Sequence, residues 1–326
     1  MIKQKSTFSQ VLCLLVFLTA NVLFSQNYSV IDSQVQTWPK SFSSPQQLAD
    51  QVGTNFKTDE DKVRAIFTWI ALNIKYDLKA YQAGSNMIAY SYSSEADRIA
   101  KEKKYRLDYA EKTLRSKKGV CQDYSALFQT VCDLSGIKCI AIIGTSKAHP
   151  SQIGKLPKAN DHEWNAVKIN DKWQLIDVTW AAGSVSMETG KFQTEFNDGY
   201  FFTKPELFYL NHFPADKRLL MIDRSPQDFA ELPLYYGPYV QANYEFVAPE
   251  KGLISAATGA VLFQIIDLPQ NSRVSYVFTN EGKIHDIAPK RSANATEFII
   301  PLSARSRGYL TVYINNAAIV SYKIEK

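Results

Sequence analysis

Residues 119–125 read Gly-Val-Cys-Gln-Asp-Tyr-Ser, which places a thiol at the start of an amphipathic run. Apolar side chains then recur at helical spacing: Tyr124, Leu127, Phe128, Val131 and Leu134. With Gly136 as a stop signal, the pattern predicts a helix over residues 121–135. The free N–H groups and the dipole at a helix start favour a thiolate and can hold an oxyanion, so Cys121 is the candidate nucleophile. Gly119 is expected to leave room for a substrate backbone.

Downstream, two strand patterns at residues 162–169 and 172–178 flank Asn170-Asp171. Asn and Asp tolerate the positive φ angles of a tight hairpin turn. With a two-residue loop, side chains 162, 164, 177 and 179 share one face, and His162 and Asp177 become diagonal neighbours with backbones about 7–8 Å apart. A loop one residue longer would shift this pairing. The hairpin therefore predicts an imidazole–carboxylate hydrogen bond.

Cys121, His162 and Asp177 can form a nucleophile, its base and the group that orients the base. The alternatives are structural: a buried helix cysteine and a strand histidine satisfied by a neighbouring polar group. Asp177 stands in an apolar strand pattern and needs a partner in either case. The remaining histidines are interpreted as surface residues or, for the last one, as structural: His149, His285 and His212.

The 326 residues suffice for one large or two ordinary domains,. Residues 1–25 have the pattern of a secretory signal peptide, with a retained N-terminal anchor as the alternative. Their removal takes away two lysines and no acids, so the formal charge falls from +5 to +3. This charge is too mild to indicate nucleic-acid binding. No later stretch approaches the ~20 apolar residues of a membrane span. We expect a secreted or periplasmic protein with an odd number of cysteines: Cys121, Cys132 and Cys139,.

The rest of the chain predicts helices near residues 45–52, 63–74 and 95–116 and a buried strand over 137–144. From about residue 244, short β patterns alternate with turns, which predicts a small all-β sandwich. The expected domains are 26–215 for the catalytic unit, 216–243 for a connector and 244–326 for the sandwich. The sequence has no clustered His and Cys, so no metal and no cofactor are expected.

Four motifs resemble the transglutaminase-like superfamily, a permuted relative of papain-type cysteine proteases. They are residues 67–77 (FTWIALNIKYD), 119–125 (GVCQDYS), 161–165 (DHEWN) and 176–180 (IDVTW). Residues 212–214 (HFP) and the β patterns that follow are similar to the kyphoscoliosis-peptidase branch. The resemblance implies an α+β fold with N-terminal helices and an antiparallel sheet.

The resemblance also implies roles: Cys121 as nucleophile, His162 as general base and then acid, and Asp177 as the group that holds the imidazole. Cleft-supporting positions are expected at Trp69, Tyr76, Gln122, Trp164 and Trp180. Crosslinking transglutaminases often carry Gln-Cys-Trp where this chain has Val-Cys-Gln, so hydrolysis is favoured over transamidation. The expected substrate is a peptide or protein. The alternative is a non-catalytic scaffold at the cell surface whose β domain docks to a partner.

Overall fold

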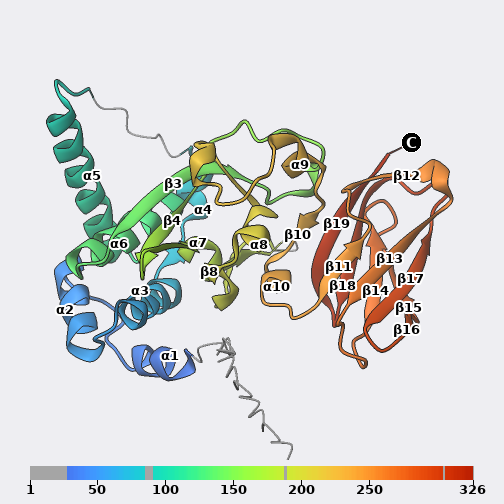
Figure 1. Cartoon of the computed structure of the whole chain (residues 1–326), viewed down its shortest axis with the longest axis horizontal. Coiled ribbons are helices and arrows are strands. Elements are labelled where there is room, and N and C mark those ends of the chain that lie inside the picture. Colours follow the sequence, from blue (N-terminus) through green and yellow to red (C-terminus); the bar gives the residue numbers. More distant parts are fainter. Residues whose placement is uncertain (1–27, 85–90, 187–188, 304, 326) are drawn as a thin grey trace, which may run out of the picture.

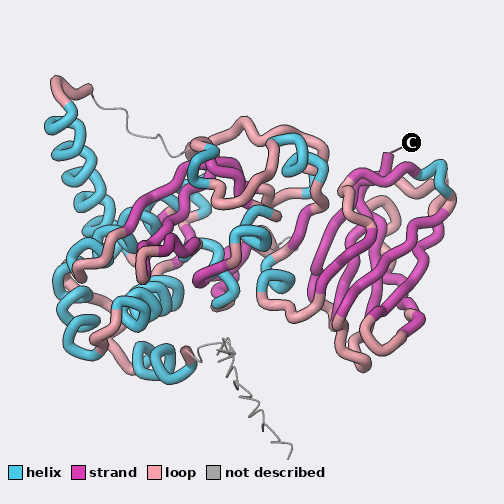
Figure 2. The backbone as a smooth tube through the Cα atoms, in the orientation of Figure 1, coloured by secondary structure: helices cyan, strands magenta, loops and turns pink. Residues whose placement is uncertain are grey.

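The computed structural model describes residues 28–84, 91–186, 189–303 and 305–325, so the predicted signal peptide lies outside the described residues. Helices gather in the N-terminal part and strands dominate the C-terminal part (Figure 2). The helices before the nucleophile are α1 (Ser29–Gln36), α2 (Pro45–Asn55), α3 (Asp59–Asn73), α4 (Leu78–Gln82) and α5 (Glu95–Ser116). None of the described helices is long and apolar enough to span a bilayer.

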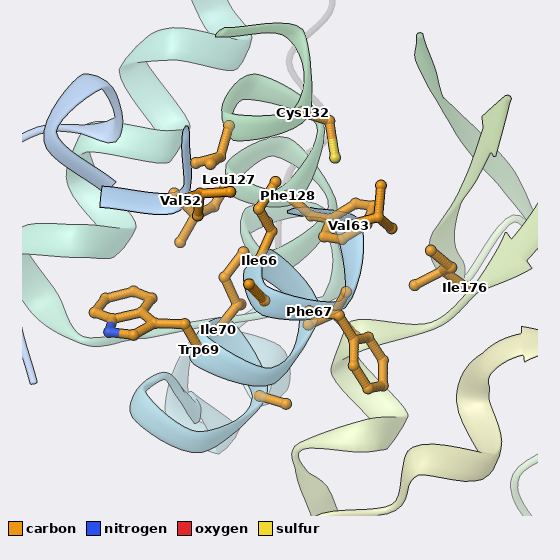
Figure 3. Close-up of a cluster of buried hydrophobic side chains, with 14 of the residues drawn as sticks. Val52, Val63, Ile66, Phe67, Trp69, Ile70, Leu127, Phe128, Cys132 and Ile176 are labelled. Atoms are coloured by element: carbon orange, nitrogen blue, oxygen red, sulfur yellow. The ribbon is translucent and has the colours of Figure 1, made fainter. Parts of the chain in front are cut away.

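The helical layer is built around α3 and α6 (Cys121–Leu134). The Thr58 side chain caps α3 by accepting the N–H of Asp61 at 3.1 Å,. Apolar side chains of α3 meet those of α6 in a fully buried cluster, with Ile176 of the sheet at its side (Figure 3). This packing fixes α6, and so the first turn of α6, against the sheet. The predicted helices at 45–52, 63–74, 95–116 and 121–135 are confirmed, with ends shifted by a few residues.

The central antiparallel sheet has the strand order β8-β5-β4-β3-β9. Its strands are β3 (Cys139–Ser146), β4 (His162–Ile169), β5 (Lys172–Ile176), β8 (Phe201–Thr203) and β9 (His212–Pro214). Helix α6 packs on one face, where the Asn165 side chain donates to the Ser125 hydroxyl at 3.0 Å. On the opposite face, Trp164 packs with Phe208 of α8 (Pro205–Tyr209). Neighbouring residues of β4 thus face different layers.

The hairpin between β4 and β5 has the predicted register, with Ile169 opposite Lys172 and Asn165 opposite Ile176. Asn170 and Asp171 both adopt positive φ, 49° and 62°, as a two-residue turn of this kind requires,. The predicted strand over 172–178 is wrong at its end. β5 stops at Ile176, and residues 178–181 form the short helix α7 (Val178–Ala181). The expected place of Thr179 on the strand face is therefore wrong.

The C-terminal strands form two sheets around a shared apolar core, which confirms the predicted sandwich. One sheet has the order β10-β19-β18-β14-β15, with β12 also paired to β19, and the other has the order β11-β13-β17-β16. Their bounds are β10 (Leu234–Tyr235), β11 (Glu245–Ala248), β12 (Leu253–Ser255), β13 (Ala260–Ile266), β14 (Val274–Phe278), β15 (Ile284–Ile287), β16 (Lys290–Arg291), β17 (Ala295–Pro301), β18 (Gly308–Ile314) and β19 (Ala317–Glu325).

The segment expected to be a connector contains α9 (Pro226–Glu231), β10 and α10 (Gly237–Val240). β10 pairs with β19, so this segment contributes a strand to the C-terminal sheet. The Lys147 side-chain amine, buried just after the end of β3, donates to the carbonyl oxygens of Phe229 at 2.5 Å and Leu232 at 2.7 Å. Figure 1 shows α9, α10 and β10 between the central sheet and the sandwich. Short strands complete the chain: β1 (Lys75–Tyr76), β2 (Lys118–Gly119), β6 (Gly183–Val185) and β7 (Phe192–Thr194).

Candidate active site

Cys121 is the first residue of α6, and its side chain is only partly buried. The preceding residues form β2, which pairs in parallel with β1, so Tyr76 lies opposite Gly119 beside the nucleophile. The N–H groups of Cys121 and Gln122 precede the first bond within the helix, which Asp123 donates to the Val120 carbonyl at 2.9 Å,. These two N–H groups are the candidate donors to an oxyanion.

The expected reason for Gly119 is wrong, because the space beside it holds a protein side chain. A Cβ atom added to Gly119 would lie 2.4 Å from Cβ of Asp123. The Asp123 carboxylate folds back onto the helix start, accepts the N–H of Val120 at 2.8 Å and lies 3.6 Å from the Lys112 ammonium. Gly119 therefore lets Asp123 cap the nucleophile helix, as an acid in a first turn does.

His162 and Asp177 are in direct contact, as the hairpin predicted. Nε2 of His162 lies 2.7 Å from Oδ2 of Asp177, and both side chains are buried. The other carboxylate oxygen, Oδ1, accepts the N–H of Trp180 at 2.9 Å, so Asp177 is also the N-cap of α7. Burial alone would raise the pKa of Asp177, but His162 and His212 hold it well below its usual range,.

The electrostatics of His162 favour the imidazolium. Burial lowers the pKa of His162, but the charge and hydrogen bond of Asp177, with a contribution from Cys121, outweigh burial and raise the pKa to about 10. Because Nε2 is bonded to Asp177, Nδ1 is the ring nitrogen left for the thiol. The structure thus brings the three predicted residues together in an arrangement that can hold a thiolate beside an imidazolium.

A second histidine, His212, also contacts Asp177. The sequence predicted only a structural role for it. Nε2 of His212 lies 2.9 Å from the same Oδ2 of Asp177, and Nδ1 lies 3.2 Å from the Phe208 carbonyl oxygen. The only signal in the sequence was its place in the HFP motif. His162, Asp177 and His212 are the one group among the described residues that could hold a metal ion. However, their N–O separations of 2.7 and 2.9 Å are hydrogen-bond distances, so we interpret the group as a hydrogen-bonded network,.

The predicted cleft-supporting residues divide into two sets. The Trp180 and Trp164 rings lie 5.4 and 5.9 Å from the His162 ring. Tyr76 lies beside the nucleophile loop, where burial and then Cys121 raise its pKa. Gln122 is partly buried next to the thiol. Trp69 instead donates its indole N–H to the Pro39 carbonyl at 2.9 Å and points away from the sheet (Figure 3), so its expected place near the cleft is wrong.

Glu163 is a charged residue near the site that sequence reasoning did not single out. It follows His162 on β4 and faces α6, where its carboxyl interacts with Ser125. Burial raises the pKa of Glu163 to about 7, against the opposing effects of Ser125 and His162. Burial therefore favours the protonated form of this carboxyl, next to the imidazole whose charge the chemistry requires.

Comparison with known proteins gives four similarities. Residues 46–178 match the sequence model of the transglutaminase-like superfamily. Kyphoscoliosis peptidase from Mus musculus is 31% identical over 229 residues, which cover 69% of this chain and 31% of that protein. Kyphoscoliosis peptidase from Homo sapiens is 33% identical over 205 residues, which cover 62% of this chain and 28% of that protein. A solved structure described as a TGase is 16% identical and covers 57% of this chain and 40% of that chain, with a TM-score of 0.30. The chain spans less than a third of the curated relatives.

Proposed function

Because the chain belongs to the transglutaminase-like superfamily through residues 46–178, we propose that it is a cysteine enzyme acting on amide bonds of peptides or proteins. The observation that carries the proposal is the buried His162–Asp177 hydrogen bond of 2.7 Å beside a thiol at a helix start. An imidazole held this way has one free nitrogen to exchange a proton with sulfur. That is the requirement for nucleophilic catalysis by cysteine.

The reaction starts from the Cys121 thiolate beside the His162 imidazolium, the pair that forms when the thiol proton passes to Nδ1 of His162,. The thiolate forms a bond to the amide carbonyl carbon, and the N–H groups of Cys121 and Gln122 stabilise the oxyanion. His162 then gives its Nδ1 proton to the amide nitrogen, the C–N bond breaks, and an amine leaves behind a thioester on Cys121. Water attacks the thioester and returns a proton to His162, which releases a carboxylic acid and the thiol. Asp177 keeps the imidazole oriented through both steps.

Hydrolysis is proposed over transamidation for two reasons. The residue after the nucleophile is Gln122, where crosslinking transglutaminases often carry tryptophan. Two relatives are named as peptidases, although this chain spans only 31% and 28% of their lengths. Both outcomes pass through the same thioester, so the choice depends on whether water or an amine reaches it.

The test uses the full mature chain with a dye-labelled casein and a fluorescent primary amine. Hydrolysis yields new amino termini and small labelled peptides, whereas transamidation attaches the amine to casein. Cys121→Ala and His162→Ala are each expected to abolish the reaction, while Cys132→Ala, which changes a buried thiol of the helical core, is expected to retain it. Full activity in either of the first two variants would overturn the assignment. Inactivity of the wild type with intact binding of a partner would favour the scaffold.

The proposed location is outside the cytoplasm, in the periplasm or the medium. It is supported by Lys3 and Lys5 followed by the mostly apolar residues 11–24,. Expression of the full-length chain with a C-terminal tag, followed by fractionation and N-terminal sequencing, tests it. A mature protein that begins near Gln26 in an exported fraction is the expected result, and an uncleaved cytoplasmic chain would contradict it.

A further inference from the structure

Asp177 has an unusual distribution of hydrogen bonds for a catalytic carboxylate. Two imidazoles, His162 at 2.7 Å and His212 at 2.9 Å, donate to the same oxygen, Oδ2, and the Trp180 N–H donates to Oδ1. The carboxylate is fully buried. A buried charge is tolerated only when hydrogen bonds replace its lost hydration. His212 is therefore part of what allows Asp177 to be ionised.

The His212 ring is held firmly by its neighbours. It stacks on Phe208 with ring centroids 4.0 Å apart and lies 4.6 Å from the Trp180 ring and 5.1 Å from the Trp164 ring. Its backbone belongs to β9, which pairs with β3 through Ser146. With 1% of its surface exposed, the ring cannot turn away without disturbing this packing,. The packing thus fixes the position of the His212 Nε2 atom that donates to Asp177.

The protonation of His212 follows from its two contacts. Both partners, the Asp177 carboxylate and the Phe208 carbonyl, are acceptors, so only a doubly protonated ring would donate to both. Burial lowers the pKa of His212, against the opposing effect of Asp177, and this favours a neutral ring. A neutral ring has one N–H, and the shorter, charge-assisted bond to the carboxylate is the stronger of the two. His212 then carries its proton on Nε2.

We propose that His212 is a positioning residue of this site: its Nε2–H holds Oδ2 of Asp177 in place, which keeps Nδ1 of His162 directed at the Cys121 thiol. This inference rests on the proposed function. Without the donor, the carboxylate loses one of three hydrogen bonds and its fixed orientation, and its hold on the imidazolium weakens. The titratable groups around this network are Cys121 and Asp123 on α6, Tyr76 on β1, His162 and Glu163 on β4, and Tyr200 before β8.

The experiment compares His212→Phe with His212→Gln in the full chain. Phenylalanine keeps the ring volume and removes the donor, whereas the glutamine amide places an N–H near the position of Nε2. The readout is the second-order rate of Cys121 alkylation by iodoacetamide from pH 5 to 10.5, with the modified cysteine identified by mass spectrometry. His285→Phe, at a partly buried histidine of the sandwich far from Cys121 in the chain, is the control for loss of a histidine.

We expect His212→Phe to lower the alkylation rate at pH 6.5 by about 10-fold or more and to shift the alkaline limb of the profile to lower pH by about one unit. His212→Gln should keep an alkylation rate close to that of the wild type. If His212→Phe does not fold, His212→Asn, whose amide is too short to reach Asp177, replaces it as the variant without the donor. If the role of His212 were purely structural, the order would be reversed: His212→Phe, which preserves a ring, would lower the alkylation rate less than His212→Gln.

The two proposals fail in different ways. If wild-type Cys121 reacts as an ordinary thiol of pKa ~8.5, the proposed function fails and the role of His212 fails with it. If the wild type reacts at low pH and folded His212→Phe has the same profile, only the role of His212 is overturned. An equal loss in His212→Gln and His212→Phe would also overturn it, because the restored N–H would then have no effect. A 15N spectrum with the proton of His212 on Nδ1 would contradict it directly.

Discussion

Nε2 of His162 lies 2.7 Å from Oδ2 of Asp177, although Asp177 falls just beyond the end of β5. Its backbone has already left the strand to begin α7, and the same carboxylate caps that helix through the Trp180 N–H. The orientation of the imidazole is therefore tied to the start of a helix as well as to the hairpin. A substitution at Asp177 can therefore disturb both the His162 contact and the cap of α7. A useful variant removes the first and keeps the second.

Asp177→Asn keeps an oxygen for the Trp180 N–H and removes the negative charge. The pKa of His162 should fall from about 10 toward its ordinary value of 6.5, because burial then acts without the opposing carboxylate. We expect a loss of about 10³-fold in amide hydrolysis and a matching loss of Cys121 alkylation at pH 6. The pH profile of alkylation checks the prediction, with circular dichroism to show that α7 persists. A profile like that of the wild type would contradict the assigned role.

The His162–Asp177 pair predicts a pH window for stability. The pKa of His162 is raised from 6.5 to about 10, so its contribution is complete below pH 6.5 and is lost as the pH rises through 10,. The pKa of Asp177 is lowered from 3.8, so its contribution is complete above pH 3.8 and is lost at lower pH. His162→Gln, which keeps an N–H for Asp177, should therefore be most destabilising at about pH 4–6.5. Urea unfolding at pH 5, 8 and 10.5 should show the difference from wild type shrinking toward pH 10.5; a constant difference would refute it.

A substitution at Glu163 should stabilise the fold, whereas the substitution at His162 should destabilise it. Burial raises its pKa from 4.5 to about 7, so ionisation destabilises the fold increasingly from pH 4.5 to 7 and fully above,. Glu163→Gln removes that penalty. The free energy of unfolding should rise by roughly 1–3 kcal/mol at pH 8 and stay unchanged at pH 4. Denaturant titration at the two pH values measures this change in the free energy of unfolding, and equal effects at both would show that folding does not raise the pKa of Glu163.

Lys147 links the central sheet to the segment before the sandwich, and its own titration gives a test. Burial lowers the pKa of Lys147 from 10.5 to about 7. Between these values the unfolded chain binds more protons, so wild-type stability rises with pH across the window. Lys147→Met keeps the length of the side chain and leaves the Phe229 and Leu232 carbonyls without their donor. It should be more destabilising at pH 9.5 than at pH 6.5 in thermal unfolding, and the reverse order would contradict the buried, neutral amine.

Gly119 and Gly53 form a matched pair of glycine substitutions. Alanine at 119 would lie 2.4 Å from Cβ of Asp123, so the start of α6 must move, at a cost of about 1–3 kcal/mol,. Alanine at 53, inside α2, meets no atom within 4 Å and should stabilise by about 0.5–1 kcal/mol,. We expect Gly119→Ala to lower both the melting temperature and the alkylation rate of Cys121. Gly53→Ala should raise the melting temperature and leave alkylation unchanged.

Local patterns were sufficient to predict much of the site. The Asn170-Asp171 turn determined the hairpin register, and the register placed His162 near Asp177, because side-chain alternation in a hairpin depends only on the loop length,. The apolar stripe after Cys121 predicted α6. These features depend on residues close together in the chain, so no knowledge of tertiary packing was needed.

The features that were missed depend on long-range contacts. Residues 178–180 combine β-branched and aromatic side chains, which favour a strand, yet Asp177 caps a helix there,. His212 reaches Asp177 only because β9 pairs with β3, a strand far away in sequence. The role of Gly119 depended on the rotamer of Asp123, and Trp69 packs on the N-terminal segment through Pro39. None of these contacts has a local sequence pattern of its own.

The pairing of β19 has a consequence for the order in which a chain that emerges from its N-terminus can fold. β19 is the partner of β10, β12 and β18, all of which precede it in sequence. Among the described strands β10 and β12 pair only with β19, so in a chain that emerges from its N-terminus they stay unpaired until residues 317–325 have also emerged. The central sheet, complete with β9 at residue 214, can form more than a hundred residues earlier. An emerging chain would thus assemble its Cys121 site first and complete the sandwich last. The segment around β10 would stay unpaired until β19 is available.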